Sequence, residues 1–193
     1  MYLRAVMKHV IESIRACYPV SDEALHAMQD KMEVFECPKH TRLIRRGVTE
    51  RYVYFIEEGV VRTFFHPQGN DTTTWFSREG DIIFGMRSLY YGSPSEESAE
   101  TLTDCRLYRM TTQNLNALYT THIDIANWGR SIHQDVHCRL SRFFVERLQQ
   151  IPKERYENFM KHFPGLINRV KLKYVAEFLG ISIYTLSRIR AGK

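Results

Sequence analysis

Side chains suited to contacts with nucleic acid gather near the carboxyl end of the sequence, between Lys171 and Arg190. Their hydroxyl, phenol, ammonium and guanidinium groups can hydrogen-bond to phosphate oxygens and to the edges of bases. A guanidinium can contact guanine O6 and N7 together, so Arg188 is the candidate for reading a base. The residues predicted to contact DNA are Lys171, Lys173, Ser182, Tyr184, Thr185, Ser187, Arg188 and Arg190.

Two short helices are predicted to position these groups. The first has an apolar face and ends at Leu179, and Gly180 then tolerates the left-handed conformation that often follows a helix. Ser182 is a good N-cap for the second helix, whose predicted apolar face is Ile183, Leu186 and Ile189. This spacing is the helix-turn-helix pattern, whose second helix enters the major groove of DNA. An ordinary helical hairpin that docks protein is the alternative with the same spacing.

The charge of the chain is concentrated on this hairpin. Residues 168–193 hold six basic side chains and one acidic side chain, a net charge of +5, which equals the net charge of all 193 residues. The preceding 167 residues are therefore electrically balanced. A solvated helical face does not need this segregation of charge, whereas a surface that faces phosphates does.

Composition excludes several classes of protein. With 44% hydrophobic residues and mixed charges, the chain is predicted to be globular rather than disordered. No apolar run approaches the roughly 20 residues of a membrane span, and residues 1–20 lack the continuous apolar segment of a signal peptide. We therefore expect a cytoplasmic protein with no membrane partner. The four cysteines are far apart in sequence and are expected to be reduced thiols.

No metal site, cofactor or catalytic site is predicted. His133 and His137 are four residues apart on an expected helix, but no further ligand is placed near them, so surface or interface histidines are the favoured interpretation. A metal-dependent β-barrel enzyme would need a closely spaced histidine pair, and His40 and His66 have no such neighbours. We therefore expect no enzyme activity.

The periodicity of the apolar residues divides the chain into three parts. Residues 1–31 are predicted to be helical, and residues 32–110 alternate in short β-branched or aromatic runs separated by glycine-containing turns. From about residue 112 to residue 149 the apolar residues again follow a helical period. They form an apolar stripe too long for one small sheet to cover. This stripe predicts a homodimer, and the expected interface residues are Trp128, Ile132, Val136, Leu140 and Phe143.

The order of these parts, and three stretches in particular, resemble the cyclic AMP receptor/FNR (Crp/Fnr) family of bacterial transcription regulators. The stretches are YVYFIEEGVVR at 52–62, the segment that begins GDIIFGMRS at 80, and LKYVAEFLGISIYTLSRIR at 172–190. The resemblance implies an α+β fold with an N-terminal antiparallel β-roll, a long dimerisation helix and a C-terminal helix-turn-helix domain. The implied boundaries are 1–120 for the sensor roll with its N-terminal helices, 121–149 for the long helix and 150–193 for the DNA-binding domain.

The resemblance also locates an effector pocket, and two departures change what it can bind. Family members that bind cyclic nucleotides have a glutamate on the ribose and an arginine on the phosphate, but Met86 and Glu97 stand at these positions. Methionine cannot accept the ribose hydrogen bond, and a carboxylate repels phosphate. Arg87 is predicted to point elsewhere. The candidate pocket residues are Gly85, Met86, Arg87, Ser88, Tyr90, Tyr91, Glu97, Ser98 and Ala99.

The sequence therefore predicts a sequence-specific transcription regulator that binds double-stranded DNA and whose effector is not cyclic AMP. Either the roll only supports the long helices, or an unknown small molecule lies against Tyr90, Tyr91 and the long helix. RNA polymerase is an expected further partner. The chain stops soon after the second helix of the hairpin, so no contacts from a following wing are expected. The alternative function is a non-enzymatic scaffold whose hairpin docks protein rather than DNA.

Overall fold

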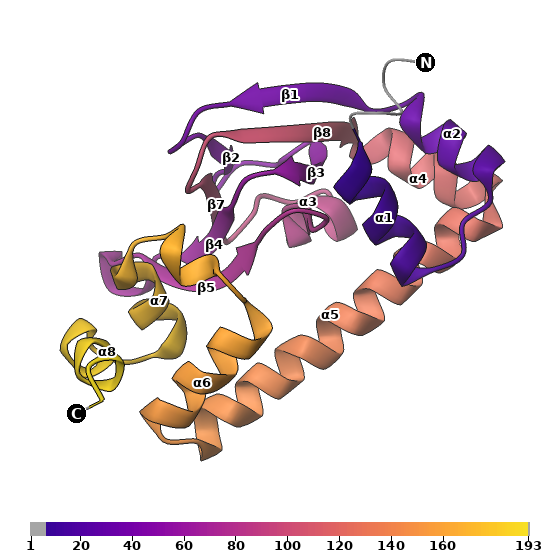
Figure 1. Ribbon diagram of the computed structural model, residues 1–193. Helices are drawn as coiled ribbons and strands as arrows, with labels where there is room; N and C mark the ends of the chain where they lie inside the picture. Colours follow the sequence, from indigo (N-terminus) through magenta and orange to yellow (C-terminus); the bar gives the residue numbers. More distant parts are fainter. Residues whose placement is uncertain (1–6, 193) are drawn as a thin grey trace.

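The structure is a computed structural model that describes residues 7–192 (Figure 1). A β-roll lies between two N-terminal helices and a C-terminal group of helices. One long helix runs from the N-terminal helices to the C-terminal group (Figure 1). The helices are α1 (Lys8–Cys17), α2 (Asp22–Gln29), α3 (Met86–Tyr91), α4 (Thr112–Thr121), α5 (Ile123–Gln149), α6 (Pro152–His162), α7 (Leu172–Leu179) and α8 (Ile183–Arg190), with short 3-10 turns η1 (Pro67–Gly69) and η2 (Leu166–Asn168).

The roll consists of two antiparallel four-stranded sheets. Their orders are β1-β8-β3-β6 and β2-β7-β4-β5. The strands are β1 (Glu33–Cys37), β2 (Arg42–Ile44), β3 (Tyr52–Glu58), β4 (Val61–Phe65), β5 (Thr72–Ser77), β6 (Ile82–Ile83), β7 (Ser98–Thr101) and β8 (Cys105–Thr111). Apolar residues from both sheets meet between them, including Ile44, Ile56, Val61 and Leu107. The predicted α+β architecture with an antiparallel roll is confirmed.

The turn between β3 and β4 requires a glycine. Gly59 has a φ of +117°, and a Cβ at this position would overlap the Sγ of Cys105. Because only glycine avoids both the backbone strain and the overlap, the Glu-Glu-Gly segment is a dependable turn signal.

The N-terminal helices cover one end of the roll. Val10 and Ile14 of α1 are buried, and the carboxylate of Glu57 accepts hydrogen bonds from the backbone N–H groups of His9 and Val10 at 3.0 and 3.1 Å. An acidic group at this end of a helix also opposes the positive end of the helix dipole. The predicted cap of α2 is confirmed, since the hydroxyl of Ser21 accepts a hydrogen bond from the N–H of Ala24. Residues 1–6 of the predicted helical segment lie outside the described residues.

Helix α5 connects the roll to the C-terminal helices. Its 27 residues correspond to a length of about 40 Å. Its first third packs on the roll, where Trp128 is buried and its ring stacks on Phe55 with 6.2 Å between centroids. Its last third extends beyond the roll towards α6 (Figure 1).

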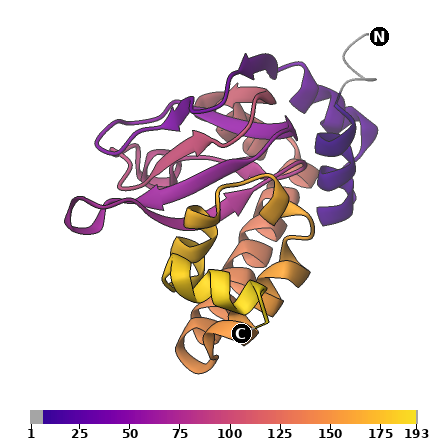
Figure 2. The same ribbon diagram turned by 60° about the vertical axis from the view of Figure 1, so that its left-hand side comes forward.

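The C-terminal helices return from the far end of α5 to the roll. Phe159 and Phe163 from α6 and its C-terminus join Phe178 of α7 around Phe76 of β5 in one buried cluster. The predicted helix-turn-helix unit therefore shares a hydrophobic core with the roll. Helix α7 lies against β5, and α8 lies on the outside of the molecule (Figure 2).

Candidate DNA interface and effector pocket

The turn of the hairpin has the geometry expected from its sequence. Gly180 has a left-handed φ of 65°, and its N–H and that of Ile181 donate to the carbonyls of Glu177 and Ala176, each at 3.0 Å. The hydroxyl of Ser182 accepts a hydrogen bond from the N–H of Thr185 at 3.0 Å and caps α8. Both predictions for this turn are confirmed.

One side of α8 faces solvent. The predicted contact residues Ser182, Tyr184, Ser187, Arg188 and Arg190 are exposed, and the side chain of Thr185 is partly exposed. Tyr184 is 81% exposed, which is unusual for an aromatic side chain that has no surface to contact.

Leu186 holds α8 in place, since it is fully buried against the other C-terminal helices. Ile189 is only partly buried, and Ile183 is 48% exposed. Of the three residues predicted for the apolar face of α8, only Leu186 is fully buried, so the buried face is narrower than predicted. Ile183 lies in the first turn of the helix, beside the exposed face, where the underlying domain does not reach it.

The basic side chains of the C-terminal segment are not equivalent. The guanidinium of Arg169 donates two hydrogen bonds to the carboxylate of Glu79 on the roll, at 2.6 and 2.9 Å. Burial opposes ionisation of Glu79, but hydrogen bonds from Arg169 and from the N–H of Gly59 outweigh it and lower the pKa of Glu79 to about 2. Lys171, Arg188 and Arg190 make no ion pair within residues 7–192, so their charge is available to a partner.

Helix α7 is attached to the roll through a partly buried carboxylate. β5 is an edge strand, and the N–H and hydroxyl of Thr73 both donate to Glu177 of α7, at 3.1 and 2.6 Å. Arg62 of β4 lies 3.5 Å from the same carboxylate and also pairs with Glu100 and Asp71. The first helix of the hairpin thus covers the edge of the sheet and satisfies one of its unpaired donors.

The region around α3 is closed by the protein's own groups. The backbone N–H of Met86 donates to the carboxylate of Glu97 at 2.7 Å, and Glu97 is only 5% exposed. Nearby, the hydroxyl of Ser88 lies 3.0 Å from that of Ser95, and a Cβ on Gly85 would overlap the Ser95 hydroxyl. A side-chain carboxylate therefore occupies the anion-binding position at the start of α3.

Several predicted pocket residues point away from the start of α3. Met86 is 51% exposed, the guanidinium of Arg87 pairs with Glu96 at 2.6 Å, and Tyr91 projects into solvent. The hydroxyl of Tyr90 lies 2.9 Å from Nδ1 of His133 on α5. Ser98 and Ala99 are buried within β7, where the Ser98 hydroxyl accepts a hydrogen bond from the N–H of Arg46. The candidate pocket residues therefore do not surround one cavity.

Comparison with known proteins agrees with this geometry. Residues 34–122 match the family model described as the cyclic nucleotide-binding domain. FixK2 from Bradyrhizobium japonicum is 17% identical, with a TM-score of 0.70 over 83% of each chain. The c-di-GMP responsive global regulator CLP from Xanthomonas campestris is 16% identical, with a TM-score of 0.70 over 89% of this chain and 91% of that one. The Crp/Fnr resemblance is confirmed.

The likeness extends through the hairpin as well as the roll. The catabolite activator protein from Thermus thermophilus is 19% identical, with a TM-score of 0.53 over 93% of this chain and 85% of that one. The comparison with curated proteins found no match. In this Crp/Fnr fold, α3 and the segment to Glu97 lie inside the matched domain, whereas α5 to α8 lie outside it.

The exposed face of α5 differs from the predicted dimer interface. Trp128 belongs to the core of the roll, and the ring of Phe143 packs on Trp75, Phe163 and Phe178. Ile132 and Val136 are partly buried, and Leu140 is 43% exposed. The side chains that point outward at the end of the helix are Phe144 (64% exposed), Val145 (47%) and Leu148 (69%).

The reason is that the last third of α5 carries apolar residues on two sides. One side, which includes Phe143, is covered by α6 and α7, and the other has no cover within residues 7–192. Sequence periodicity detects both sides but cannot rank them, because the ranking depends on where the C-terminal helices fold back.

Within residues 7–192, no group of three or more histidine, cysteine, aspartate or glutamate side chains is placed to hold a metal ion. In the same part of the chain, no helix has both the length and the apolar character needed to cross a membrane.

Two contacts between the roll and the C-terminal segment were not predicted from the sequence. They are the Thr73–Glu177 attachment and the Arg169–Glu79 pair, whose members are 104 and 90 residues apart. The one available signal was that Glu177 is the only acidic residue in the basic segment 168–193.

Proposed function

We propose that this protein is a non-enzymatic transcription regulator that binds double-stranded DNA through α8. The observation that carries the proposal is the exposed polar and basic side of this helix, which follows a helix-turn-helix turn and is held by Leu186. The charge balance supports it, since the basic excess of the chain lies on this segment and Lys171, Arg188 and Arg190 have no acidic neighbours to neutralise them within residues 7–192. The 1–120, 121–149 and 150–193 division is the organisation that we propose for it.

The side chains of the hairpin are proposed to divide between two tasks. Arg188 reads a base, since it lies on the exposed side of α8 one turn after Tyr184. Lys171, Lys173 and Arg190 contact phosphates and position the helix without reading sequence. Lys173 lies 3.9 Å from Glu177, so its charge is partly compensated in the free protein.

We propose a homodimer along α5, with the interface moved to the outward side chains Phe144, Val145 and Leu148. Leu148 follows Phe144 by four residues, and Ser141 precedes Phe144 by three, which is the spacing of a coiled-coil seam. A two-fold dimer implies a nearly palindromic DNA site with half-sites about one helical turn apart. RNA polymerase is a further partner that we propose on the family resemblance alone.

We propose that cyclic AMP is not the effector. The carboxylate of Glu97 already accepts the hydrogen bond of the first N–H of α3, and its negative charge would repel a phosphate placed there. Proteins of this fold differ in the nucleotide that they bind. CLP is described as responsive to c-di-GMP, and the regulatory domain of Toxoplasma gondii PKA was solved with cyclic AMP.

The test is a mobility-shift assay against genomic fragments over a series of salt concentrations. For fragments selected by the protein, Arg188→Ala is expected to cost about 1–3 kcal/mol per half-site and to relax the preference at one base pair. Lys173→Ala is expected to weaken selected and random DNA alike and to reduce the salt slope by about one unit for each phosphate that the protein no longer neutralises. Lys39→Ala, an exposed lysine on the roll, serves as the control.

Two outcomes would contradict the proposal. Equal weakening of selected and random DNA by Arg188→Ala would make Arg188 a phosphate contact rather than a base reader. Absence of binding to any DNA at low salt would favour the alternative function, a scaffold whose hairpin docks protein.

A further inference from the structure

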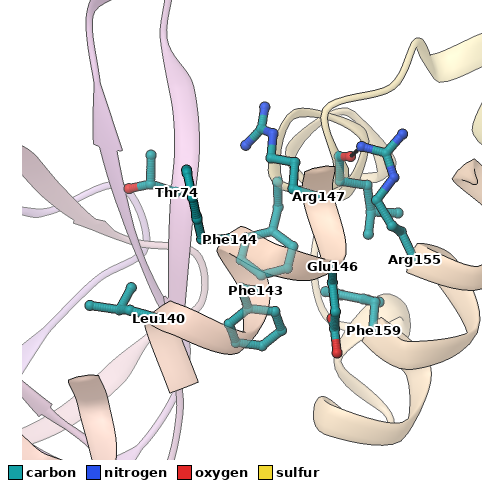
Figure 3. A pocket seen from close by; sticks show the side chains of 10 residues that line it. Thr74, Leu140, Phe143, Phe144, Glu146, Arg147, Arg155 and Phe159 are labelled. Carbon is teal, nitrogen blue, oxygen red and sulfur yellow. Dashed lines mark hydrogen bonds between the residues drawn. The ribbon is translucent and has the colours of Figure 1, made fainter. Parts of the chain in front are cut away.

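A cavity of about 360 Å³ lies where the roll, the long helix and the hairpin meet (Figure 3). Its wall is largely aromatic, with Phe143 and Phe144 from α5, Phe159 from α6 and Phe178 from α7. Thr74 of β5 closes the side towards the roll. The volume is at the lower end of the range for small-molecule sites, about 300–1,000 Å³, which are also mostly apolar with a few polar groups.

Two arginines provide the polar groups of this cavity. Arg147 of α5 and Arg155 of α6 line it, and their guanidinium groups lie at the same end (Figure 3). Arg155 donates to the carbonyl oxygen of Leu179 at 2.8 Å, but its Nε is buried without a hydrogen-bond partner among residues 7–192. Arg147 forms no ion pair or hydrogen bond within the same part of the chain. Burial lowers the pKa of Arg155, and the charge of Arg147 lowers it further.

The acidic residue of the cavity does not neutralise this pair. The carboxylate of Glu146 points away from both guanidinium groups (Figure 3) and lies 3.8 Å from Nε2 of His162. Two like charges therefore share the end of an aromatic cavity, and no carboxylate of the described residues lies between them. A buried donor without a partner is costly, and a bound anion would relieve both the unmade hydrogen bond and the repulsion.

We infer that this cavity binds a small organic carboxylate whose acid group pairs with Arg147 and Arg155 and whose apolar body packs among the four phenylalanines. Guanidinium groups bind carboxylates through strong, charge-assisted hydrogen bonds, and the aromatic wall offers an apolar surface to the rest of the ligand. None of the predicted pocket residues around α3 lines this cavity, so the site is distinct from the one that Glu97 closes.

The position of the site connects ligand binding to the DNA-binding hairpin. The guanidinium of Arg147 lies against the hairpin turn, since a Cβ on Gly180 would come within 2.6 Å of its Nη2. Arg155 holds the carbonyl of Leu179, the residue before that turn. A ligand that draws both arginines towards itself would therefore change how α7 and α8 sit on α5. This effect on DNA rests on the proposed function, whereas binding of the ligand does not.

The test measures binding by calorimetry on the full chain without DNA. The probes are decanoate and biphenyl-4-carboxylate, each paired with its neutral amide. The variants are Arg147→Met and Arg155→Met, which remove the charge and keep an apolar stem. Arg142→Met is the matched control, because Arg142 is exposed on the same helix but does not line the cavity. Since Arg155→Met also removes the hydrogen bond to Leu179, Arg147→Met is the variant that decides.

We expect at least one carboxylate to bind more tightly than its amide. Arg147→Met is expected to weaken carboxylate binding by about 10- to 100-fold and to leave amide binding unchanged, as removal of a charged hydrogen-bond partner does. Arg142→Met is expected to have no effect.

Three results would overturn the inference. They are no binding of either carboxylate at millimolar concentration, equal binding of carboxylate and amide, and equal losses of affinity in Arg147→Met and Arg142→Met. The first result, together with a change of oligomeric state in Arg147→Met, would assign the cavity to a second copy of the chain, because Phe144 also lies on the outward face of α5. Failure of the mobility-shift assay alone would refute the proposed function and leave ligand binding intact.

Discussion

The attachment of α7 to the edge of the roll allows a quantitative test of how the hairpin is held. Replacing Glu177 by alanine removes the carboxylate that accepts two hydrogen bonds from Thr73, at 2.6 and 3.1 Å, and that lies 3.5 Å from Arg62. Hydrogen bonds to charged groups contribute about 1.5–3 kcal/mol each, so the two bonds set an upper bound of about 3–6 kcal/mol. Because Thr73 is on an edge strand, water reaching the vacated site offsets part of this loss, and we expect a cost of about 2–4 kcal/mol.

The measurement is the free energy of unfolding from urea denaturation, combined with hydrogen exchange of the amides in α7 and β5. Faster exchange in these two elements is expected before any change in β3 or β8, because the variant weakens the hairpin attachment and not the centre of the roll. Glu157→Ala is the control, since Glu157 is exposed on α6 and makes no ion pair within residues 7–192. Its expected effect is within about 0.5 kcal/mol.

A double-mutant cycle with Thr73→Val separates the contact from other effects of each substitution. The hydroxyl of Thr73 also receives a hydrogen bond from Arg62 at 3.2 Å, so Thr73→Val alone reports on more than one contact. A coupling energy of about 1 kcal/mol or more between the two substitutions is expected for residues in direct contact. If Glu177→Ala behaves like the control, or if the two substitutions are additive, the carboxylate does not hold the hairpin on the roll and the reasoning is refuted.

Three further predictions concern the dimer, the α3 pocket and the acid stability. Leu148→Glu should give a folded monomer by light scattering, because a charge buried in a helix–helix interface costs several kcal/mol. The control Gln149→Glu should remain dimeric. If both variants are dimeric, the interface lies elsewhere. Calorimetry should detect no micromolar binding of cyclic AMP, and Glu97→Arg should raise the affinity; micromolar binding by the unmodified protein would contradict this. The depressed pKa of Glu79 stabilises the fold above its ordinary value of 4.5, and this stability should disappear as the pH falls from 4.5 to about 2. Arg169→Met should flatten that part of the stability profile, and an unchanged profile would show that the pair is not responsible.

Local features of this protein could be read from its sequence. The left-handed turn at Gly180, the cap at Ser182 and the glycine turn at Gly59 were predictable because each depends on a few neighbouring residues and on backbone sterics. The change of apolar period from helix to strand and back likewise located the roll and the long helix. The carboxylate at Glu97 was visible as a departure from a family pattern, although its hydrogen bond to α3 was not.

The tertiary structure alone decided which of these residues meet and which remain free. Arg169 counts as a basic residue in the sequence, yet Glu79 neutralises it from 90 residues away. Phe143 and Phe144 are neighbours with the same chemistry, yet one is packed against the hairpin and the other faces solvent. The Arg147–Arg155 pair and its aromatic cavity exist only because α6 folds back along α5. Periodicity and capping describe one segment at a time, whereas ion pairs, cavities and exposed faces depend on how distant segments pack together.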